Sequence, residues 1–181
     1  MSRKVQVVIL CEDTQHESFL LRFLERMGWP RRGMRVEKAP PGEGSAEQFI
    51  RKRFPLELEA HRSRPVRQAL VVMWDGDNQG LAARLRTLDQ ACTDHQINPR
   101  AANERVAVFV PTWNLESWLA YLDGETIDEG RSNYPRLSRP RECRQQVEVL
   151  AEMCDRNKLR NPAPDSLERA CLEYGTRLRP N

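Results

Sequence analysis

The sequence predicts an α/β fold in which helices cover both faces of a parallel sheet. Apolar, β-branched runs of the length of buried strands lie at residues 5–11, 69–74 and 106–110, and residues 35–39 are a further, short strand candidate. A segment with helical spacing of apolar residues follows each run. Because right-handed crossovers place helices on the two faces, this order predicts about four mainly parallel strands.

Helices are expected after each strand and towards the C-terminus. Thr14 with Glu17, and Ser45 with Gln48, form S/T-x-x-E/Q sequences that are expected to cap the first two helices. In such a capping box, each side chain bonds a backbone N–H that the helix leaves unpaired. The segments with helical periodicity are residues 19–27, 45–62, 81–92, 115–122, 142–157 and 166–178.

Length and composition favour one folded domain with an appendage. The chain has 181 residues, of which 30% are charged and 39% hydrophobic. That balance is typical of a folded protein with an ionised surface. Residues 1–123 are expected to form the α/β core. Residues 124–181, an Arg- and Pro-rich loop followed by helices, are expected to form a C-terminal helical extension packed on the core.

The composition argues against several classes of protein. The longest apolar run, Val7 to Cys11, is far too short to cross a bilayer, and no secretory segment precedes it, so a cytoplasmic protein without membrane contact is expected. Five scattered cysteines without C-x-x-C spacing predict reduced thiols rather than a disulfide framework or a zinc site. His16, His61 and His95 lie far apart and are expected at the surface, so any metal should be bound by oxygen.

Acidic residues follow three of the predicted strands. Glu12 follows the first, Asp75-Gly76-Asp77 follows the third, and Glu116 lies in the first turn of the helix behind the fourth. In a parallel sheet these strand ends share the edge where ligands bind. Gathered carboxylates repel one another, so the cluster should bind Mg²⁺ or Mn²⁺ or have a raised pKa. Glu12, Asp75, Asp77 and Glu116 are therefore the candidate metal ligands and catalytic residues.

Structural roles stay open for these acids. An ordinary loop carboxylate is the alternative for Glu12, and a polar strand-to-helix turn is the alternative for residues 75–80. An EF-hand loop is excluded, because Gln79 occupies its fifth position and Arg86 its twelfth. Glu116 lies where the helix macrodipole favours an acid in any case.

Two segments concentrate positive charge. Residues 51–67 and 131–144 each carry a net charge of +4, although the formal net charge of the whole chain is only +3. Clustered cations can position a nucleic-acid backbone without selecting its sequence. The alternative is that both segments are solvated surfaces. The candidate nucleic-acid-binding residues are Arg51, Lys52, Arg53, Arg136, Arg139 and Arg141.

Three short motifs resemble the toprim domain of topoisomerases, bacterial primases, small ribosomal-RNA-maturing ribonucleases and overcoming-lysogenisation-defect nucleases. Glu12 matches the toprim glutamate after the first strand. The D-x-D-x-x-G turn of the family is matched by Asp75, Asp77 and Gly80. Residues 115–119, Leu-Glu-Ser-Trp-Leu, look like the E-x-W-L element of small standalone toprim-like proteins associated with bacterial defence ATPases.

The resemblance covers residues 5–123 and implies a Rossmann-like toprim fold with Mg²⁺-dependent cleavage of DNA or RNA. The four acids would hold the metal, with Glu12 as a ligand or as the general acid/base. Many toprim domains have glycine where this chain has Asp13, so Asp13 is a further candidate ligand. The resemblance also implies the effector subunit of an anti-phage system, with an ABC- or AAA-type ATPase as partner. The oligomeric state stays open, and a homodimer is one candidate assembly.

Two other functions stay open. One is a non-catalytic toprim-like regulatory or scaffold subunit that binds a partner protein or a nucleotide. The other is a flavodoxin-like or receiver-like binding module, which is disfavoured because such modules need no acid after the fourth strand. The sequence has no P-loop motif, so nucleotide hydrolysis by this chain is not expected.

Overall fold

Four parallel strands form one sheet in the order β2-β1-β3-β4. The structure is a computed structural model, and it describes residues 5–64 and 68–179. Arg67, at the end of the first basic segment, lies outside the described residues. The strands are β1 (Val7–Cys11), β2 (Met34–Lys38), β3 (Ala69–Met73) and β4 (Val106–Phe109). This sheet, with helices on both faces, confirms the predicted α/β fold class and is consistent with a Rossmann-like fold.

The position of each strand in the sheet explains its composition. Every residue of β1, β3 and β4 is buried, as the continuous apolar runs predict. β2 is half-buried at the edge of the sheet. The edge position accommodates charged residues, and Arg35 on β2 donates to Glu57 of the neighbouring helix at 2.5 Å.

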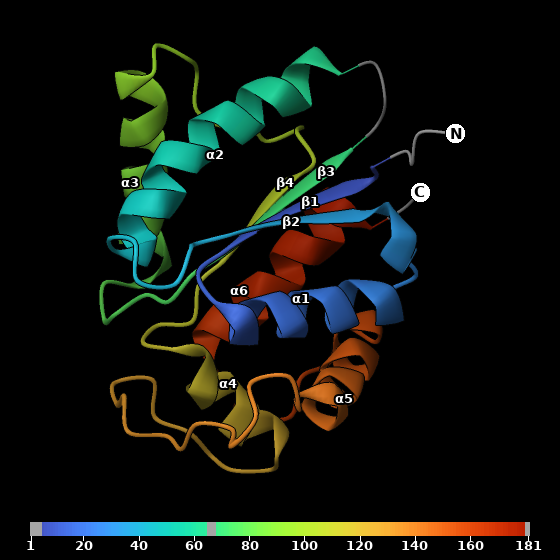
Figure 1. The fold of residues 1–181 in the computed structure, drawn as a ribbon. Helices are drawn as coiled ribbons and strands as arrows, with labels where there is room; N and C mark the ends of the chain where they lie inside the picture. Colours follow the sequence, from blue (N-terminus) through green and yellow to red (C-terminus); the bar gives the residue numbers. More distant parts are fainter. Residues whose placement is uncertain (1–4, 65–67, 180–181) are drawn as a thin grey trace.

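Helices form a layer on each face of the sheet (Figure 1). One layer consists of α2 (Ala46–Ser63) and α3 (Gly80–Asp94), and its core includes Ile50, Phe54 and Leu88 against the even-numbered side of β1. The opposite layer packs Phe19 and Phe23 against the odd-numbered side of β1. Its helices are α1 (Thr14–Arg26), α4 (Leu115–Leu122), α5 (Arg144–Asp155) and α6 (Asp165–Glu173), followed by the π-helical turn η2 (Tyr174–Leu178).

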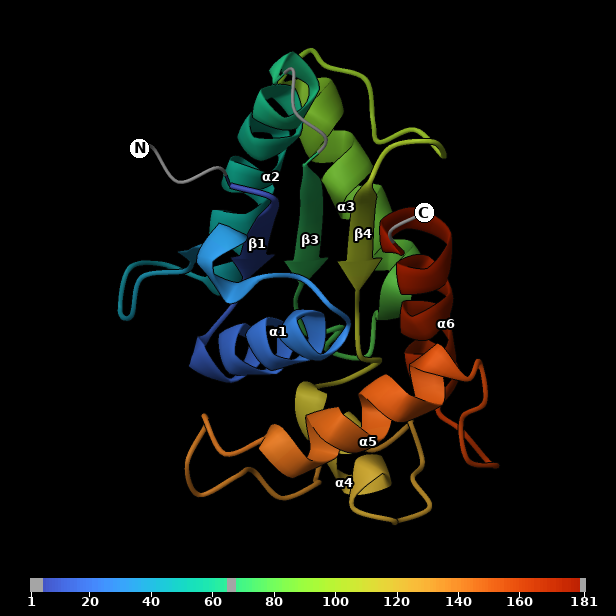
Figure 2. The ribbon, with the colours of Figure 1, turned by 90° about the vertical axis from the view of Figure 1, so that its right-hand side faces the viewer.

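The C-terminal helices share the hydrophobic core with the residues before them. α5 contacts α1 and α4, and α6 contacts β4 (Figure 2). The ring of Tyr174 lies 5.2 Å from that of Phe23 in an edge-to-face arrangement. A disulfide joins Cys154 of α5 to Cys171 of α6, so the prediction that all thiols are reduced is wrong for this pair. No helix among the described residues is both long enough and apolar enough to span a bilayer.

The predicted cap of α2 by Ser45 is confirmed, and the predicted cap of α1 by Thr14 is wrong. Ser45 accepts a hydrogen bond from the backbone N–H of Gln48 at 3.2 Å, as expected at the start of α2. At the start of α1 the capping residue is Asp13 rather than Thr14, because the Asp13 carboxylate accepts from the N–H of His16 at 2.9 Å. Glu17 forms an ion pair with Lys38 instead.

Candidate metal centre

Asp75 joins three strand ends at the carboxyl edge of the sheet. It follows Trp74 at the end of β3, and its N–H donates to Glu12 Oε2, just beyond β1, at 3.0 Å. Its own Oδ1 accepts from the N–H of Leu115, the first residue of α4, at 3.0 Å. The predicted convergence of the ends of β1, β3 and β4 therefore occurs, with the Asp75 carboxylate at its centre.

His16 completes a compact group of ligand atoms. Its Nε2 lies 3.0 Å from Asp75 Oδ1, and its Nδ1 lies 2.8 Å from Asp13 Oδ1. Ligand atoms of Glu12, His16 and Asp75 all lie within 4.8 Å of one another. His16 is 1% exposed, so its predicted surface position is wrong.

A local sequence signal could have located His16. An aspartate that caps a helix and a histidine three residues later lie on the same side of the first turn, where their side chains can meet. Asp13 and His16 have this spacing directly after a buried strand. The prediction compared His16 only with the other two histidines, which are far away in the sequence, and did not consider Asp13 as its partner.

The charges in this group shift the pKa values of its members. Burial opposes protonation of His16, but hydrogen bonds to Asp13 and Asp75 and their negative charges raise its pKa well above the ordinary value of 6.5. Burial alone would raise the pKa of Asp13, but the contacts with His16 lower it to about 2. Burial raises the pKa of Glu12, only partly offset by the N–H of Asp75. In the metal-free protein, the contacts with two carboxylates therefore favour the protonated form of the His16 imidazole.

The turn that carries Asp75 is tightly packed against the end of β4. The N–H of Gly76 donates to the carbonyl of Pro111 at 2.9 Å. A Cβ atom on Gly76 would lie 2.3 Å from the carbonyl oxygen of Thr112, so no other residue fits without moving the backbone. Gly76 is thus required because the backbone of this turn lies in direct contact with the backbone of Pro111 and Thr112. The left-handed backbone conformations occur later in the turn, including Asp77 with φ of 47° and Gly80 with φ of 73°.

Asp77 faces an arginine and lies outside the three-residue group. Arg84 of α3 donates to Asp77 Oδ2 at 2.8 Å, to Glu47 Oε2 at 3.1 Å and to the carbonyl of Asp75 at 3.0 Å. The Arg84 side chain is 2% exposed, whereas that of Asp77 is 65% exposed. Burial and the charge of Asp75 raise the pKa of Asp77, and Arg84 offsets part of this rise. Asp77 therefore serves as a counterion for a buried cation in this structure.

Glu116 is likewise paired with an arginine. It is 4% exposed in the first turn of α4, next to the residue whose N–H bonds Asp75. Arg136, from the segment between α4 and α5, reaches Glu116 Oε1 at 2.9 Å. The side chain of Arg136 is 85% exposed, so a carboxylate at the carboxyl edge is neutralised by a cation from the surface.

Three of the six candidate nucleic-acid-binding residues have anionic partners. Besides the pair of Arg136 with Glu116, Arg53 contacts Glu57 at 2.8 Å and Arg139 contacts Glu142 at 3.0 Å. The others, Arg51, Lys52 and Arg141, are exposed and have no ion-pair partner among residues 5–64 and 68–179. These three cations are the members of the set that can take an external phosphate without first breaking an ion pair.

Comparisons of the chain with protein-family models, with curated proteins and with solved structures found no match. The side chains of the centre define the chemistry that it can support. Two carboxylates and one imidazole form a mixed oxygen and nitrogen donor set, which suits a divalent metal ion. The contact of Asp13 with the second nitrogen of His16 is the arrangement that orients metal-binding histidines in proteins. The residues present fit a metal ion, with Glu12, His16 and Asp75 as ligands.

Proposed function

We propose that this protein is a toprim-like nuclease that hydrolyses phosphodiester bonds of DNA or RNA with a bound divalent metal ion. The observation that carries the proposal is the convergence of Glu12, His16 and Asp75 ligand atoms within 4.8 Å at the carboxyl edge of a parallel sheet. The toprim resemblance of Glu12 and of the turn beginning at Asp75 supports phosphodiesters as the substrate class.

Each side chain of the centre would have a distinct role in this reaction. Asp75 and the Nε2 atom of His16 would bind the metal, and Asp13 would hold the imidazole in the required orientation. Glu12, whose pKa is raised by burial, would be the third ligand or would accept the proton of the attacking water. The metal, when bound, would neutralise charge that develops on the phosphoryl oxygens.

The donor set refines the expected metal. Four carboxylates were predicted, a set suited to Mg²⁺, but one donor of the observed group is an imidazole. Carboxylates and imidazoles together accommodate Mn²⁺ better than Mg²⁺, which keeps an octahedral shell of oxygens and several waters. Mn²⁺ is therefore the first ion to test.

Purified protein with Mn²⁺ is expected to cleave DNA or RNA oligonucleotides and to hydrolyse bis(4-nitrophenyl) phosphate, a small diester. Removal of the metal with EDTA should stop both reactions, and added Mn²⁺ should restore them, because the metal supplies the charge neutralisation. Cleavage that persists in EDTA, or that co-purifies with a contaminant rather than with the protein, would contradict the proposal.

A second function, a regulatory or scaffold subunit without catalysis, is favoured by one observation. Arg84 and Arg136 occupy the carboxylates of Asp77 and Glu116, which leaves two of the four predicted acids in the metal-binding group. A protein that binds no divalent ion at millimolar concentration, but forms a stable complex with an ATPase, would fit this function. The ATPase partner and the role in anti-phage defence stay predictions from the resemblance.

Metal binding should strengthen as pH rises, because the raised pKa values of Glu12 and His16 make protons compete with the metal for these ligand atoms. Their raised pKa values mean that the folded protein binds these protons more tightly than the unfolded chain does. This stabilisation is complete below the ordinary values of 4.5 and 6.5, and is lost as pH rises through the raised values. The apparent metal affinity should increase up to about tenfold per pH unit for each proton displaced.

The measurement is the rise in melting temperature that Mn²⁺ causes at pH about 6 and at pH about 8, which reports affinity through linkage. The rise should be larger at the higher pH. In Glu12→Gln, which cannot release a proton from this position, the pH dependence should be weaker. An equal effect of Mn²⁺ at both pH values would show that protons and metal do not compete for the centre.

A further inference from the structure

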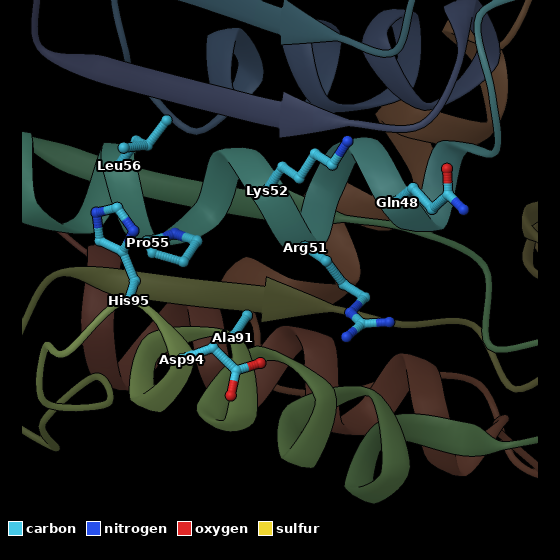
Figure 3. Close-up of a pocket in the computed structure, with 8 residues that line it drawn as sticks. All are labelled: Gln48, Arg51, Lys52, Pro55, Leu56, Ala91, Asp94 and His95. Atoms are coloured by element: carbon cyan, nitrogen blue, oxygen red, sulfur yellow. The ribbon is translucent and has the colours of Figure 1, made fainter.

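Helices α2 and α3 border an open groove on the outer side of their layer (Figure 3). Its volume is about 470 Å³, in the range of sites that bind nucleotide-sized groups. α2 supplies one wall and the last turn of α3 supplies the other. The lining residues are Gln48, Arg51, Lys52, Pro55 and Leu56, and across from them Ala91, Asp94 and His95.

The sequence of α2 separates this groove wall from the core. Gln48, Lys52 and Leu56 are four residues apart and therefore lie along one side of the helix. Ile50 and Phe54 are fully buried on the side that faces the sheet. The groove wall is thus available for contacts outside the chain.

Arg51 and Lys52 carry positive charge that the helix does not neutralise. Glu47, one turn before Arg51, is bound to Arg84 at 3.1 Å, and the residue one turn after Arg51 is Pro55. The positions one turn before and after Lys52 are Gln48 and Leu56, which are uncharged. In the part of the chain that the structure describes, neither cation has an anionic partner.

Asp94 is the acidic residue among the groove's lining residues, and it lies on the α3 wall. Asp94 accepts from Gln90 at 2.8 Å, and His95 lies 3.9 Å from Glu59. Figure 3 shows Gln48 and Arg51 towards the arrowheads of the strands and His95 towards the opposite end. The positive end of the groove is therefore the end nearer to the carboxyl edge of the sheet.

A series of contacts links that positive end to the candidate metal centre. Gln48 directly follows Glu47, whose carboxylate bonds Arg84, and Arg84 donates to the carbonyl of Asp75 at 3.0 Å. We propose that this groove binds the phosphate backbone of the nucleic-acid strand that is cut at the metal centre, with Arg51 and Lys52 contacting its phosphates. This inference rests on the proposed nuclease function and adds the path of the substrate.

The test uses the double variant Arg51→Ala with Lys52→Ala. Binding of a fluorescein-labelled DNA oligonucleotide is measured by anisotropy at several salt concentrations in EDTA, where the strand is not cut. Each lost phosphate contact should lower the slope of log affinity against log salt by about 0.9 for duplex or about 0.7 for single strands. Both changes together should lower it by about 1.4 to 1.8.

The matched control is Arg31→Ala with Arg32→Ala, which removes the same charge from exposed residues of the short helix η1 (Arg31–Gly33) outside the groove. The groove variant should also slow cleavage of oligonucleotides in Mn²⁺ by a larger factor than it slows hydrolysis of bis(4-nitrophenyl) phosphate. The inference would be overturned by a groove variant with the wild-type salt slope. It would also be overturned if the control variant lowered the salt slope as much as the groove variant does.

Two further outcomes separate this inference from the function on which it rests. If the wild-type protein hydrolyses neither the oligonucleotide nor the small diester, the nuclease proposal fails, and the substrate path fails with it. If the small diester is hydrolysed but the groove variant loses only binding of poly-glutamate, the groove belongs to an acidic protein segment and the substrate path alone is overturned.

Discussion

Asp75→Asn is expected to abolish metal binding and to slow cleavage by about 10²- to 10⁴-fold, because metal ions stabilise such transition states by several kcal/mol and each 1.36 kcal/mol is tenfold in rate. Asparagine has the shape of aspartate, and its side-chain oxygen can still accept from the N–H of Leu115. The turn should therefore keep its conformation while the charge that faces His16 is lost.

Metal affinity is measured by calorimetry with Mn²⁺, and cleavage by the rate on the small diester. Asp89→Asn is the matched control, because Asp89 is exposed on α3 and outside the metal-binding group. It should leave both quantities unchanged. Undiminished Mn²⁺ affinity in a folded Asp75→Asn protein would place the metal elsewhere and remove the basis of the proposed function.

Local patterns predicted the fold well because β1, β3 and β4 are continuous apolar runs between polar turns. The helix at residues 115–122 has the predicted bounds, and β3 differs by one residue. The disulfide between Cys154 and Cys171 was not predictable, because it depends on how α5 and α6 pack, with the two Cα atoms 5.4 Å apart. Cysteine spacing carries no information about such packing when no motif is present.

The candidate site was predictable where the sheet alone determines proximity. Glu12 and Asp75 follow adjacent parallel strands, so their meeting follows from the topology. The partners of Asp77 and Glu116 depend on where long arginine side chains point. Arg84 lies in the second turn of the next helix and Arg136 in a loop, and no sequence pattern fixes either direction.

Arg84→Met is expected to lower the free energy of unfolding by roughly 2–4 kcal/mol, from the loss of charge-assisted hydrogen bonds and of one bond to a backbone carbonyl. The guanidinium also stacks on Trp74, with 4.5 Å between its central carbon and the ring centroid. Methionine fills similar space but bonds none of these partners. The loss of stability stays in this range because Glu47 and Asp77 are 44% and 65% exposed, so water can hydrate their carboxylates after the change.

Chemical denaturation in EDTA gives the stability change without a contribution from metal. Arg139→Met is the matched control, because the same substitution there breaks an exposed ion pair with Glu142 and should cost at most about 1 kcal/mol. Arg84→Lys keeps the charge but lacks the planar fork that reaches several acceptors, so it should recover only part of the loss.

Arg84→Met, together with Asp77→Asn, also tests whether Asp77 is a counterion of Arg84 or a metal ligand. If Asp77 is chiefly the counterion of Arg84, then Asp77→Asn lowers stability in EDTA and leaves Mn²⁺ affinity close to wild type, in contrast to Asp75→Asn. In Arg84→Met, the freed Asp77 carboxylate lies near Asp75 and becomes available as an additional ligand. Mn²⁺ should then stabilise Arg84→Met more than it stabilises the wild-type protein. A smaller stabilisation would mean that Arg84 holds Asp75 in place for the metal, and that its bond to the Asp75 carbonyl matters more than its neutralisation of Asp77.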